Sequence, residues 1–421
     1  MRPQEAEQRL LALELFGMRF GLDRMRRLMT ALGHPERKFK SIHVVGTNGK
    51  SSTVRMTAAI LAHHGHKVGS YLSPHLVSYN ERVRIGDVDL TPQQFADAIE
   101  RALKAAQQVD HGAPEDDHVT QFELLTAAAY SELARQAVEV AVIEAGLGGR
   151  YDATNVIPSS VQVLTGVGLE HTRWLGSTIT AIAREKLDVV QAGATLVLGP
   201  DMHPEAMAVA QEVAAERGAT IVQADSDPHA AVGALGAFQR RNFAVARAAA
   251  QALLGELDEQ AVIAAAADVR VPGRMQIVGR EPLTLLDGAH NPDGITALAE
   301  SMAELSRGSR TPDGKVVAVV SILDDKNASD MLSTIARNCD LIVLTASQSP
   351  RALPPPTLLS LLAQTGVEAG AEIVSTPHAA LKRARQLAGP GGLVVATGSI
   401  YLIADLVSDP VTAGARRASI L

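Results

Sequence analysis

A glycine-bearing segment, GTNGKSS at 46–52, holds residue types that bind nucleotide phosphates. Glycines let backbone N–H groups turn toward phosphate oxygens, and a following helix presents its positive N-terminus to them. Lys50 adds a point charge for the β- and γ-phosphates, and a hydroxyl of Ser51 or Ser52 suits Mg²⁺. The standard phosphate loop has a glycine where this chain has Val44, so this loop is shorter. A Gly/Asn-rich structural turn is the alternative interpretation.

Three further candidates lie near expected strand ends or on a helix. Glu144 ends an apolar run and is followed by a glycine-rich stretch, AGLGGRYDATN at 145–155. Open parallel sheets bind ligands at the carboxyl ends of their strands, so Glu144 is a candidate ligand-binding residue. A salt bridge at the end of the strand is the equal alternative. His171 follows another expected strand, and Lys186 lies on an expected helix. Taken singly, a structural histidine and a solvated lysine are the more common cases.

The motif DGAHNP at 287–292 is the strongest signal in the last third of the chain. Asn291 followed by Pro292 predicts a helix N-cap with proline at the first helical position. Asp287 and His290 are not explained by capping, so both are candidate functional residues.

The elements around these motifs alternate between strand-like and helix-like segments. Expected strands occupy 41–45, 67–72, 138–144, 161–165, 195–198, 221–224, 283–287, 316–320, 341–345, 372–375 and 393–397. Expected helices fill the first 30 residues and 53–64, 122–136, 179–190, 205–217 and 239–254. The alternation predicts an α/β fold with mostly parallel sheets covered on both faces, and a domain boundary within 271–281. The acidic segment at 113–118 is expected to be a solvated loop.

Composition narrows the class of protein. The chain has 421 residues, 46% of them hydrophobic, which suits two α/β domains. Aromatic residues make up 3% and the net charge is −7, which disfavours a nucleic-acid partner. No apolar run approaches the roughly 18 residues of a membrane helix, so no membrane association is expected. Cys339 is the single cysteine and the N-terminal segment lacks a signal-peptide pattern, so we expect a cytoplasmic protein. We also expect a monomer.

Taken together, the motifs resemble those of the folylpolyglutamate synthase/dihydrofolate synthase family, of the bifunctional bacterial type, within the Mur ligase superfamily. The matches run in family order along nearly the whole chain: GTNGK at 46–50, SPHL at 73–76, NERVR at 80–84, FELLT at 122–126, EAGLGGRYDATN at 144–155, EHTRWLG at 170–176, REK at 184–186, PGRMQ at 272–276, DGAHNP at 287–292 and TGSIYL at 397–402. The resemblance implies a P-loop-like Mur-ligase ATP-binding domain at 1–271 and a smaller Rossmann-like glutamate-ligase domain at 272–421, with ATP in the cleft between them.

The resemblance also implies a reaction. Enzymes of this family use ATP and Mg²⁺ to join L-glutamate to dihydropteroate or to (tetrahydro)folate mono- and polyglutamates, in folate biosynthesis. The substrate carboxylate attacks the γ-phosphate, and the glutamate amine then displaces phosphate from the acyl phosphate. We expect both synthase activities, with a monofunctional folylpolyglutamate synthase as the nearest alternative.

More distant alternatives lack a required feature. Another Mur-type ligase would need an N-terminal domain for a uridine diphosphate group, and the short lead before Gly46 is expected to leave no room for it. A non-enzymatic ATP switch or a transport ATPase would not require the DGAHNP motif. A Rossmann oxidoreductase would need a GxGxxG segment opening a βαβ unit.

By the same resemblance, four groups of residues form the site. Nucleotide binding is expected of Thr47, Asn48, Gly49, Lys50, Ser51, Ser52, Asn242, Arg274 and Asp287. Metal binding is expected of Ser51, Ser73, Glu144, His171 and Lys186, the last matching a lysine that is carbamylated in related enzymes. The expected catalytic residues are Lys50, His171, Lys186 and His290, of which His290 faces the incoming amino acid. Pterin-side binding is expected of Thr120, Phe122, Tyr151, Asp152 and Ala153.

Two positions depart from the family pattern. The family loop usually reads GKGS or GKGT, whereas here Ser51 replaces the second glycine and Ser52 keeps the hydroxyl. A Cβ at this position restricts the backbone, so a slightly different loop geometry is expected. After Arg-Glu-Lys the family commonly has Ala-Gly, where this chain has Leu187 and Asp188. Asp188 is therefore a candidate ion-pair partner of Lys186, and such a pair would compete with carbamylation of the lysine.

Overall fold

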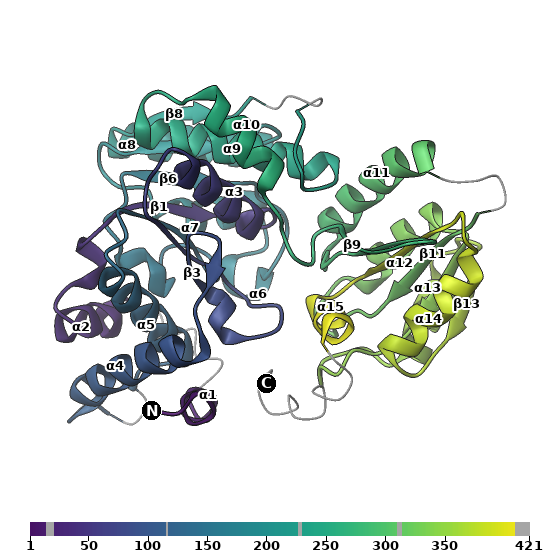
Figure 1. The fold of residues 1–421 in the computed structure, drawn as a ribbon, viewed down its shortest axis with the longest axis horizontal. Coiled ribbons are helices and arrows are strands. Elements are labelled where there is room, and N and C mark those ends of the chain that lie inside the picture. Colours follow the sequence, from purple (N-terminus) through teal and green to yellow (C-terminus); the bar gives the residue numbers. More distant parts are fainter. Residues whose placement is uncertain (14–20, 115–116, 226–229, 310–313, 409–421) are drawn as a thin grey trace. The chain divides into compact units, whose positions relative to one another are not determined.

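The computed structural model describes residues 1–13, 21–114, 117–225, 230–309 and 314–408. The chain divides into two compact units: unit 1 comprises Met1–Gly233 and Arg240–Val269, and unit 2 comprises Ala234–Gln239 and the chain from Arg270 onward. Each unit is built around one sheet with helices on its faces, as Figure 1 shows. The expected α/β class is confirmed.

The sheet of unit 1 has eight strands in the order β4-β3-β2-β5-β1-β6-β7-β8. From β2 to β8 all neighbours are parallel, while β3 and β4 form an antiparallel edge. The central strands are buried along nearly their whole length, because helices cover both faces. The bounds are β1 (Lys40–Val45), β2 (Val68–Tyr71), β3 (Val83–Ile85), β4 (Val88–Asp89), β5 (Val140–Glu144), β6 (Val161–Leu164), β7 (Thr195–Leu198) and β8 (Thr220–Gln223).

Helices flank this sheet in two apolar layers. Their bounds are α1 (Pro3–Leu11), α2 (Asp23–Ala31), α3 (Lys50–His63), α4 (Pro92–Asp110), α5 (Gln121–Arg135), α6 (Thr172–Leu175), α7 (Ile179–Leu187), α8 (Pro204–Arg217), α9 (Ala237–Leu254) and α10 (Glu259–Asp268). One hydrophobic cluster joins α1, α2, α4 and α5 to β2 and β5, and another joins α7 and α8 to β6 and β7. Helix α3 lies against β1, β2 and β5, and α10 packs on α3.

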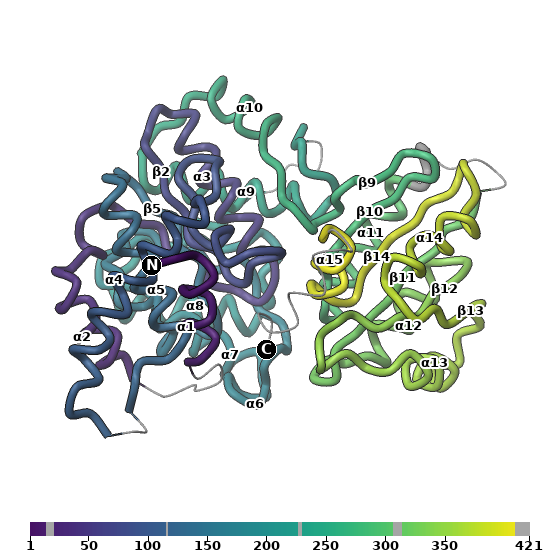
Figure 2. Tube along the Cα trace, turned by 60° about the horizontal axis from the view of Figure 1, so that its bottom comes forward, coloured from purple at the N-terminus to yellow at the C-terminus, as the bar shows by residue number. Residues whose placement is uncertain are grey.

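The sheet of unit 2 has six strands in the order β13-β12-β11-β14-β10-β9, and β9 is its antiparallel edge. Figure 2 shows β11, β12 and β13 following one another across this sheet. The core lies between the sheet and α11, α12 and α13. The bounds are β9 (Gln276–Arg280), β10 (Leu283–Leu286), β11 (Val316–Val320), β12 (Leu341–Leu344), β13 (Gly370–Ile373), β14 (Leu393–Thr397), α11 (Pro292–Ser309), α12 (Ala328–Asn338), α13 (Pro355–Gln364), α14 (Pro377–Ala388) and α15 (Ile400–Val407).

Some elements differ from the sequence-based expectation. Helix α3 begins at Lys50 rather than at Thr53, because Gly49, with φ of +85°, turns the chain directly into the helix. Strand β13 lies two residues before the expected 372–375. The edge strands β3, β4 and β9 were not predicted, because short strands with charged or exposed side chains lack an apolar run.

Two expected segments extend beyond the described residues. The helical N-terminal segment is confirmed by α1 and α2, and residues 14–20 lie outside the described part. Of the acidic loop, residues 115–116 also lie outside it. Asp117 is not simply solvated, because it forms ion pairs with Arg24 at 2.6 Å and with Arg27 at 3.1 Å.

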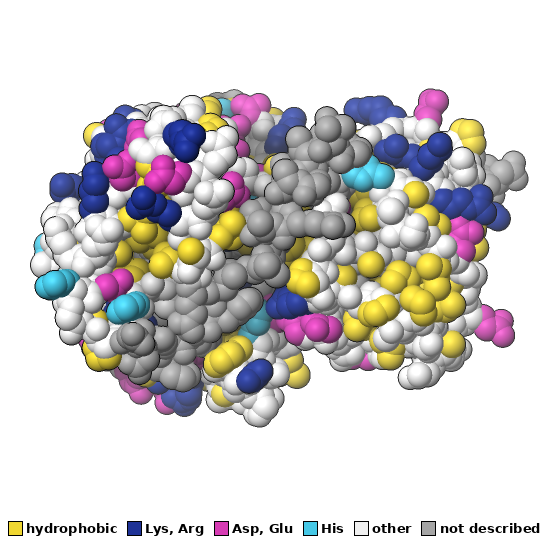
Figure 3. Space-filling view, turned by 90° about the horizontal axis from the view of Figure 1, so that it is seen from below, with side chains coloured by type: hydrophobic (Ala, Val, Ile, Leu, Met, Phe, Trp, Pro, Cys, Tyr) yellow, Lys and Arg dark blue, Asp and Glu magenta, His cyan; other side chains and the backbone are white. Residues whose placement is uncertain are grey.

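The surface carries some exposed apolar side chains. In unit 2 they include Ile277, Val278, Leu359 and Ile373. Figure 3 shows a group of hydrophobic side chains on the face of unit 2 that it presents. Among the described residues, no helix has the length and apolar character needed to cross a membrane.

Candidate active site

The carboxyl ends of four neighbouring strands bring the motifs of unit 1 together. Strands β2, β5, β1 and β6 lie side by side, and the register pairs Val44 of β1 with Glu144 of β5. Because these strands are parallel, the segments that follow them start at one edge of the sheet. Such an edge is where open α/β sheets bind ligands.

The loop at 46–49 has no space for side chains at its two glycines. Gly46 has φ of +150°, and a Cβ there would lie 1.9 Å from Thr165 Oγ1. Gly49 has φ of +85°, and a Cβ there would lie 2.5 Å from Asn242 Oδ1. The left-handed backbone therefore favours glycine at both positions, and a side chain at Gly49 would also displace Asn242. Asn242, an expected nucleotide residue, lies against this loop.

The segment after β6 holds the loop in place. Thr47 N donates to Gly166 O at 2.9 Å, and Thr47 Oγ1 accepts from Gly168 N at 3.0 Å. Thr165 Oγ1 donates to Asn48 O at 2.6 Å. The Thr47 hydroxyl thus maintains the loop's shape. Ser52 is buried, whereas the side chains of Asn48, Lys50 and Ser51 are partly exposed.

Glu144 lies between two hydrogen-bond donors from different elements. It is 1% exposed; Ser51 Oγ donates to its Oε1 at 2.8 Å, and Ser73 N donates to its Oε2 at 3.1 Å. Ser51 comes from the first turn of α3 and Ser73 from the segment after β2, so they converge because β5 lies between β1 and β2. A carboxylate beside a hydroxyl group is a donor set that suits Mg²⁺.

His171 lies at the start of α6 in a left-handed conformation, with φ of 52°. Its side chain is 39% exposed, and its Nε2 lies 3.9 Å from Glu170 Oε1. Within the described ranges, no three His, Cys, Asp or Glu side chains form a group that could hold a metal ion. A metal at this edge therefore needs ligands of other types besides Glu144 and His171, such as hydroxyl groups or a modified lysine.

Lys186 is a buried lysine directed at the phosphate loop. It is 4% exposed, and its Nζ donates to Gly46 O at 3.0 Å. Burial, and secondarily the positive charge of Lys50, lower the pKa of Lys186 to about 7. A neutral lysine amine is a nucleophile toward carbon dioxide, so this environment is compatible with carbamylation.

Asp188 has arginine partners instead of the expected contact with Lys186. Its Oδ2 lies 3.4 Å from Arg150 Nε, and its Oδ1 accepts a hydrogen bond from Arg217 Nη2 at 3.4 Å. The segment after β5 is also held against α7, because Arg150 N donates to Glu185 O at 3.0 Å. The structure therefore shows no competition by Asp188 for Lys186 among the described contacts.

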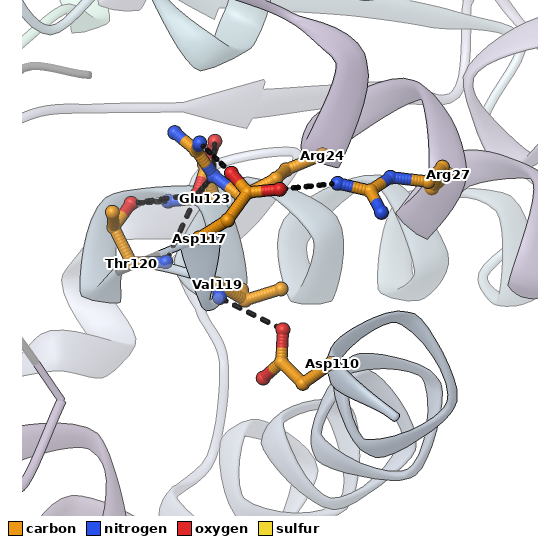
Figure 4. Close-up of polar contacts among 7 residues, drawn as sticks. All are labelled: Arg24, Arg27, Asp110, Asp117, Val119, Thr120 and Glu123. Atoms are coloured by element: carbon orange, nitrogen blue, oxygen red, sulfur yellow. Dashed lines mark hydrogen bonds and ion pairs between the residues drawn. The ribbon is translucent and has the colours of Figure 1, made fainter. Parts of the chain in front are cut away.

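Thr120 caps α5 within a partly buried ionic network, shown in Figure 4. Its N–H and its hydroxyl both donate to Glu123 Oε2, at 2.9 and 3.0 Å. Arg24 Nε lies 3.2 Å from each carboxylate oxygen of Glu123, and Arg24 Nη1 donates to Asp117 Oδ1 at 2.6 Å. The Thr120 hydroxyl gives its proton to Glu123 Oε2 and accepts from Glu123 N at 3.3 Å, so both of its roles are used in the cap of α5.

Phe122 joins α5 to the glycine-rich segment after Glu144. Its ring stacks on Tyr71 with centroids 6.4 Å apart and an angle of 28°. A Cβ on Gly146 would lie 2.5 Å from Phe122 Cζ. The ring is partly buried, so it packs on the core and also keeps exposed surface.

Asp152 stabilises the segment after β5 by accepting hydrogen bonds from residues on either side of it in the chain. Its Oδ2 accepts from Leu147 N at 2.7 Å, and its Oδ1 accepts from the N–H and the hydroxyl of Thr154. It is 6% exposed, and burial raises its pKa. His43 Nε2 lies 2.8 Å from Thr154 Oγ1. Because that hydroxyl gives its proton to Asp152, the histidine is the donor in this contact.

The other two pterin-side candidates differ in exposure. Ala153 is 5% exposed, whereas Tyr151 is 38% exposed and lines a cavity of about 610 Å³. Charged side chains also line this cavity, among them Asp23, Arg26, Asp188 and Arg217. The structure thus places Tyr151 at the surface and Ala153 in the core.

In unit 2, Asp287 directly follows β10, and Arg274 precedes β9, the strand that pairs with β10. Asp287 is 2% exposed and accepts from Met275 N at 2.9 Å and from Ala289 N at 2.8 Å. Burial raises its pKa, and the positive charge of Arg274 opposes that shift. A Cβ on Gly288 would lie 2.3 Å from Arg274 Nη1, so only glycine leaves space for this guanidinium.

His290 and Asn291 follow in the same motif. His290 Nδ1 lies 2.9 Å from Gly288 O, and since a carbonyl only accepts, Nδ1 carries the proton. Asn291 Oδ1 accepts from Gly294 N at 2.8 Å, and α11 begins at Pro292, which confirms the predicted N-cap.

Known proteins are similar to this chain in sequence and in fold. Residues 273–400 match the family model described as Mur ligase, glutamate ligase domain. The dihydrofolate synthase/folylpolyglutamate synthase of Bacillus subtilis (strain 168) is 30% identical over 93% of this chain and 95% of its own. The enzyme of the same name from Escherichia coli (strain K12) is 33% identical over 81% of each chain. The chain belongs to the dihydrofolate synthase/folylpolyglutamate synthase family.

Solved structures of this family have the same fold. Mycobacterium tuberculosis folylpolyglutamate synthase complexed with ADP and AMPPCP matches with a TM-score of 0.88 at 29% identity, over 97% of this chain and 100% of that one. E. coli FolC in complex with DHPP and ADP matches with a TM-score of 0.85 at 28% identity, over 99% of both chains. The bifunctional enzyme of Yersinia pestis, complexed with AMPPNP and Mn ion, matches with a TM-score of 0.83 at 29% identity, over 99% of this chain and 98% of that one. The expected family and ATP-dependent ligase class are thereby confirmed.

Four residues that support the candidate site through hydrogen bonds or ion pairs were not predicted from the sequence: His43, Thr165, Arg24 and Glu123. Glu123 had a usable signal, since Thr-x-x-Glu before an apolar run is a capping box. His43 and Thr165 are single polar residues within or just after apolar strands, and such positions do not reveal their partners. Arg24 had no local signal, because its partner Glu123 is 99 residues away.

Proposed function

We propose that this protein joins L-glutamate to dihydropteroate and to reduced folates that already carry glutamate, with conversion of ATP to ADP. The observation that supports this most directly is the convergence of the phosphate loop, Glu144 and Lys186 at one edge of the unit 1 sheet. The relatives from B. subtilis and E. coli, whose names include both activities, support the bifunctional assignment.

The phosphate loop and Lys50 are proposed to hold the nucleotide phosphates, with the N-terminus of α3 facing them. The remaining residues of this nucleotide site are Thr47, Asn48, Gly49, Ser51, Ser52 and Asn242. The substrate carboxylate attacks the γ-phosphorus, ADP leaves, and an acyl phosphate forms. The glutamate amine then attacks the acyl carbon, the amine loses a proton, and inorganic phosphate leaves.

Metal binding is proposed for Glu144, His171, Ser73 and Lys186, and Ser51 contributes to this site through its hydrogen bond to Glu144. When bound, Mg²⁺ neutralises negative charge on the phosphates. The buried amine of Lys186 supports its carbamylation: Nζ forms a bond to the carbon of carbon dioxide and loses a proton. That reaction turns a basic side chain into an anionic oxygen donor.

Pterin-side binding is proposed for Thr120, Phe122, Tyr151, Asp152 and Ala153. The partly exposed ring of Phe122 suits a flat heterocycle, whereas Thr120 is buried and contributes by holding the start of α5 through Glu123. Asp152 and Ala153 are buried, so their contribution falls to shaping the segment after β5.

The residues of unit 2 are proposed to serve the nucleotide and the amino acid. The planar guanidinium of Arg274 suits a phosphate, and Asp287 is the nucleotide-side carboxylate. The contact of His290 Nδ1 with Gly288 O orients the imidazole, whose other nitrogen is proposed to face the incoming amine. We assign ATP binding to 1–271 and glutamate ligation to 272–421, in a protein that acts as a cytoplasmic monomer.

The test supplies purified protein with ATP, Mg²⁺ and glutamate, and then dihydropteroate or a reduced folate monoglutamate in turn. Glutamylated product and ADP from both substrates are expected. Product from the folate alone would leave a monofunctional enzyme, the alternative favoured by the folylpolyglutamate synthase of Lacticaseibacillus casei, which is 32% identical over 89% of this chain and 91% of its own. Product from neither substrate would overturn the proposal.

A further inference from the structure

Ser51 is the one residue of the phosphate loop at which this chain departs from the usual glycine of its family. Its side chain has a defined partner, because Ser51 Oγ donates a hydrogen bond to Glu144 Oε1 at 2.8 Å. A glycine has no atom that reaches this carboxylate, and an alanine has no donor. The substitution therefore adds a contact to the site.

The fold sets the geometry of that contact. Strands β1 and β5 are paired in register, so the loop after β1 starts beside the end of β5. Gly49 turns the chain into α3, and Ser51 lies in the first turn of that helix. Its hydroxyl reaches Glu144 although the two residues are 93 positions apart.

The second oxygen of Glu144 is held from the opposite side, where Ser73 N donates to Oε2 at 3.1 Å. Donors from α3 and from the segment after β2 thus restrain both oxygens of a carboxylate that is 1% exposed. Neutral donors of this kind orient a carboxylate without neutralising its charge, so the carboxylate retains its attraction for a cation.

We propose that Ser51 is a positioning residue that orients Glu144 for the divalent metal of the metal–nucleotide complex. The inference rests on the proposed function, because it takes Glu144 as a metal ligand. Ser51 acts through Glu144. Its hydroxyl therefore increases the affinity for the metal only when the Glu144 carboxylate is present.

Mn²⁺ binding tests the role without turnover. The free Mn²⁺ signal in electron paramagnetic resonance is measured with the full chain and a non-hydrolysable ATP analogue. Ser51→Ala and Ser51→Gly are expected to raise the Mn²⁺ dissociation constant about fivefold. This is the size of effect expected from the loss of one hydrogen bond. Ser51→Thr keeps the hydroxyl and is expected to stay within about twofold of the wild type. Ser51→Gly restores the usual family residue, so loss of folding is not expected in this variant.

A double-mutant cycle separates positioning from direct ligation. In a Glu144→Gln background, Ser51→Ala is expected to change the Mn²⁺ dissociation constant by less than about twofold. An undiminished fivefold effect in that background would show Ser51 to be a ligand in its own right and would overturn the proposal. Equal Mn²⁺ affinities of wild type and Ser51→Ala would also overturn it. Failure of the proposed function has a different signature, the absence of glutamate-dependent ADP formation in the wild type.

Discussion

The side-chain nitrogens of Lys50 and Lys186 donate to the same acceptor, the carbonyl oxygen of Gly46, each at 3.0 Å. The positive charge of Lys50 disfavours a second ammonium beside it, and burial of Lys186 disfavours its charged form more strongly. Together they lower the pKa of Lys186 to about 7. The pair therefore favours a neutral, reactive amine on Lys186 near neutral pH.

Lys186 is expected to form a carbamate whose yield rises as the pH increases through about 7, because only the neutral amine reacts. Carbon-13 NMR with labelled bicarbonate across pH 6 to 9 (roughly one pH unit or more on each side of that pKa) checks this. Lys50→Met removes the neighbouring charge, so the rise is expected at higher pH. Lys186→Arg is expected to lose the signal and about 100-fold of turnover. A carbamate signal that survives in Lys186→Arg contradicts the assignment.

His43 is expected to make unit 1 less stable in acid. Burial lowers its pKa from 6.5 to about 4, so its contribution is complete above pH 6.5 and is lost as the pH falls from 6.5 toward 4. The upper limit of this loss is about 3 kcal/mol. His43→Gln keeps an N–H donor for Thr154 but does not titrate, so the decline in its unfolding free energy should be shallower.

Urea unfolding followed by fluorescence of Trp174, the single tryptophan of the chain, reports on unit 1. His118→Gln, at an exposed position, is the matched control and should keep the wild-type pH dependence. An equally steep decline in His43→Gln would show that other groups cause it.

Gly146→Ala is expected to weaken binding of the pterin-side substrate. The added Cβ would lie 2.5 Å from Phe122 Cζ, so the ring must leave its place against Tyr71. We expect the KM for dihydropteroate to rise about tenfold while the KM for ATP stays within about twofold. Steady-state kinetics with each substrate varied checks this, with Phe122→Leu as the comparison. A parallel rise in both KM values would indicate damage to the whole edge of the sheet.

Arg24→Met is expected to lower the unfolding free energy of unit 1 by about 3 kcal/mol, because it leaves the buried Glu123 carboxylate without its cation. Arg184→Met is the matched control: its ion pair with Glu212 has side chains 50% and 45% exposed and should contribute less than about 1 kcal/mol. Urea unfolding of both variants measures the difference. Similar small losses would mean that Thr120 holds Glu123, and Arg27 holds Asp117, adequately without Arg24.

Features with a local signal followed from the sequence. The apolar runs predicted most strands of both sheets, Asn291-Pro292 predicted the start of α11, and GTNGK predicted a loop leading into a helix. These features depend on residues a few positions apart, where backbone preference and hydrogen bonding act directly. The motif order also indicated the family, and with it the candidate residues.

The contacts within the site depended on the tertiary structure. The buried strands β1, β5 and β6 have similar apolar compositions, so the sequence does not state which of them are neighbours. Only the order β2-β5-β1-β6 places Glu144 between Ser51 and Ser73. In the same way, the sequence alone is consistent with Lys186 as an ordinary charged lysine on a solvated helix face. Its neutral amine results from packing of α7 against the loop, because burial removes the water that stabilises the ammonium form.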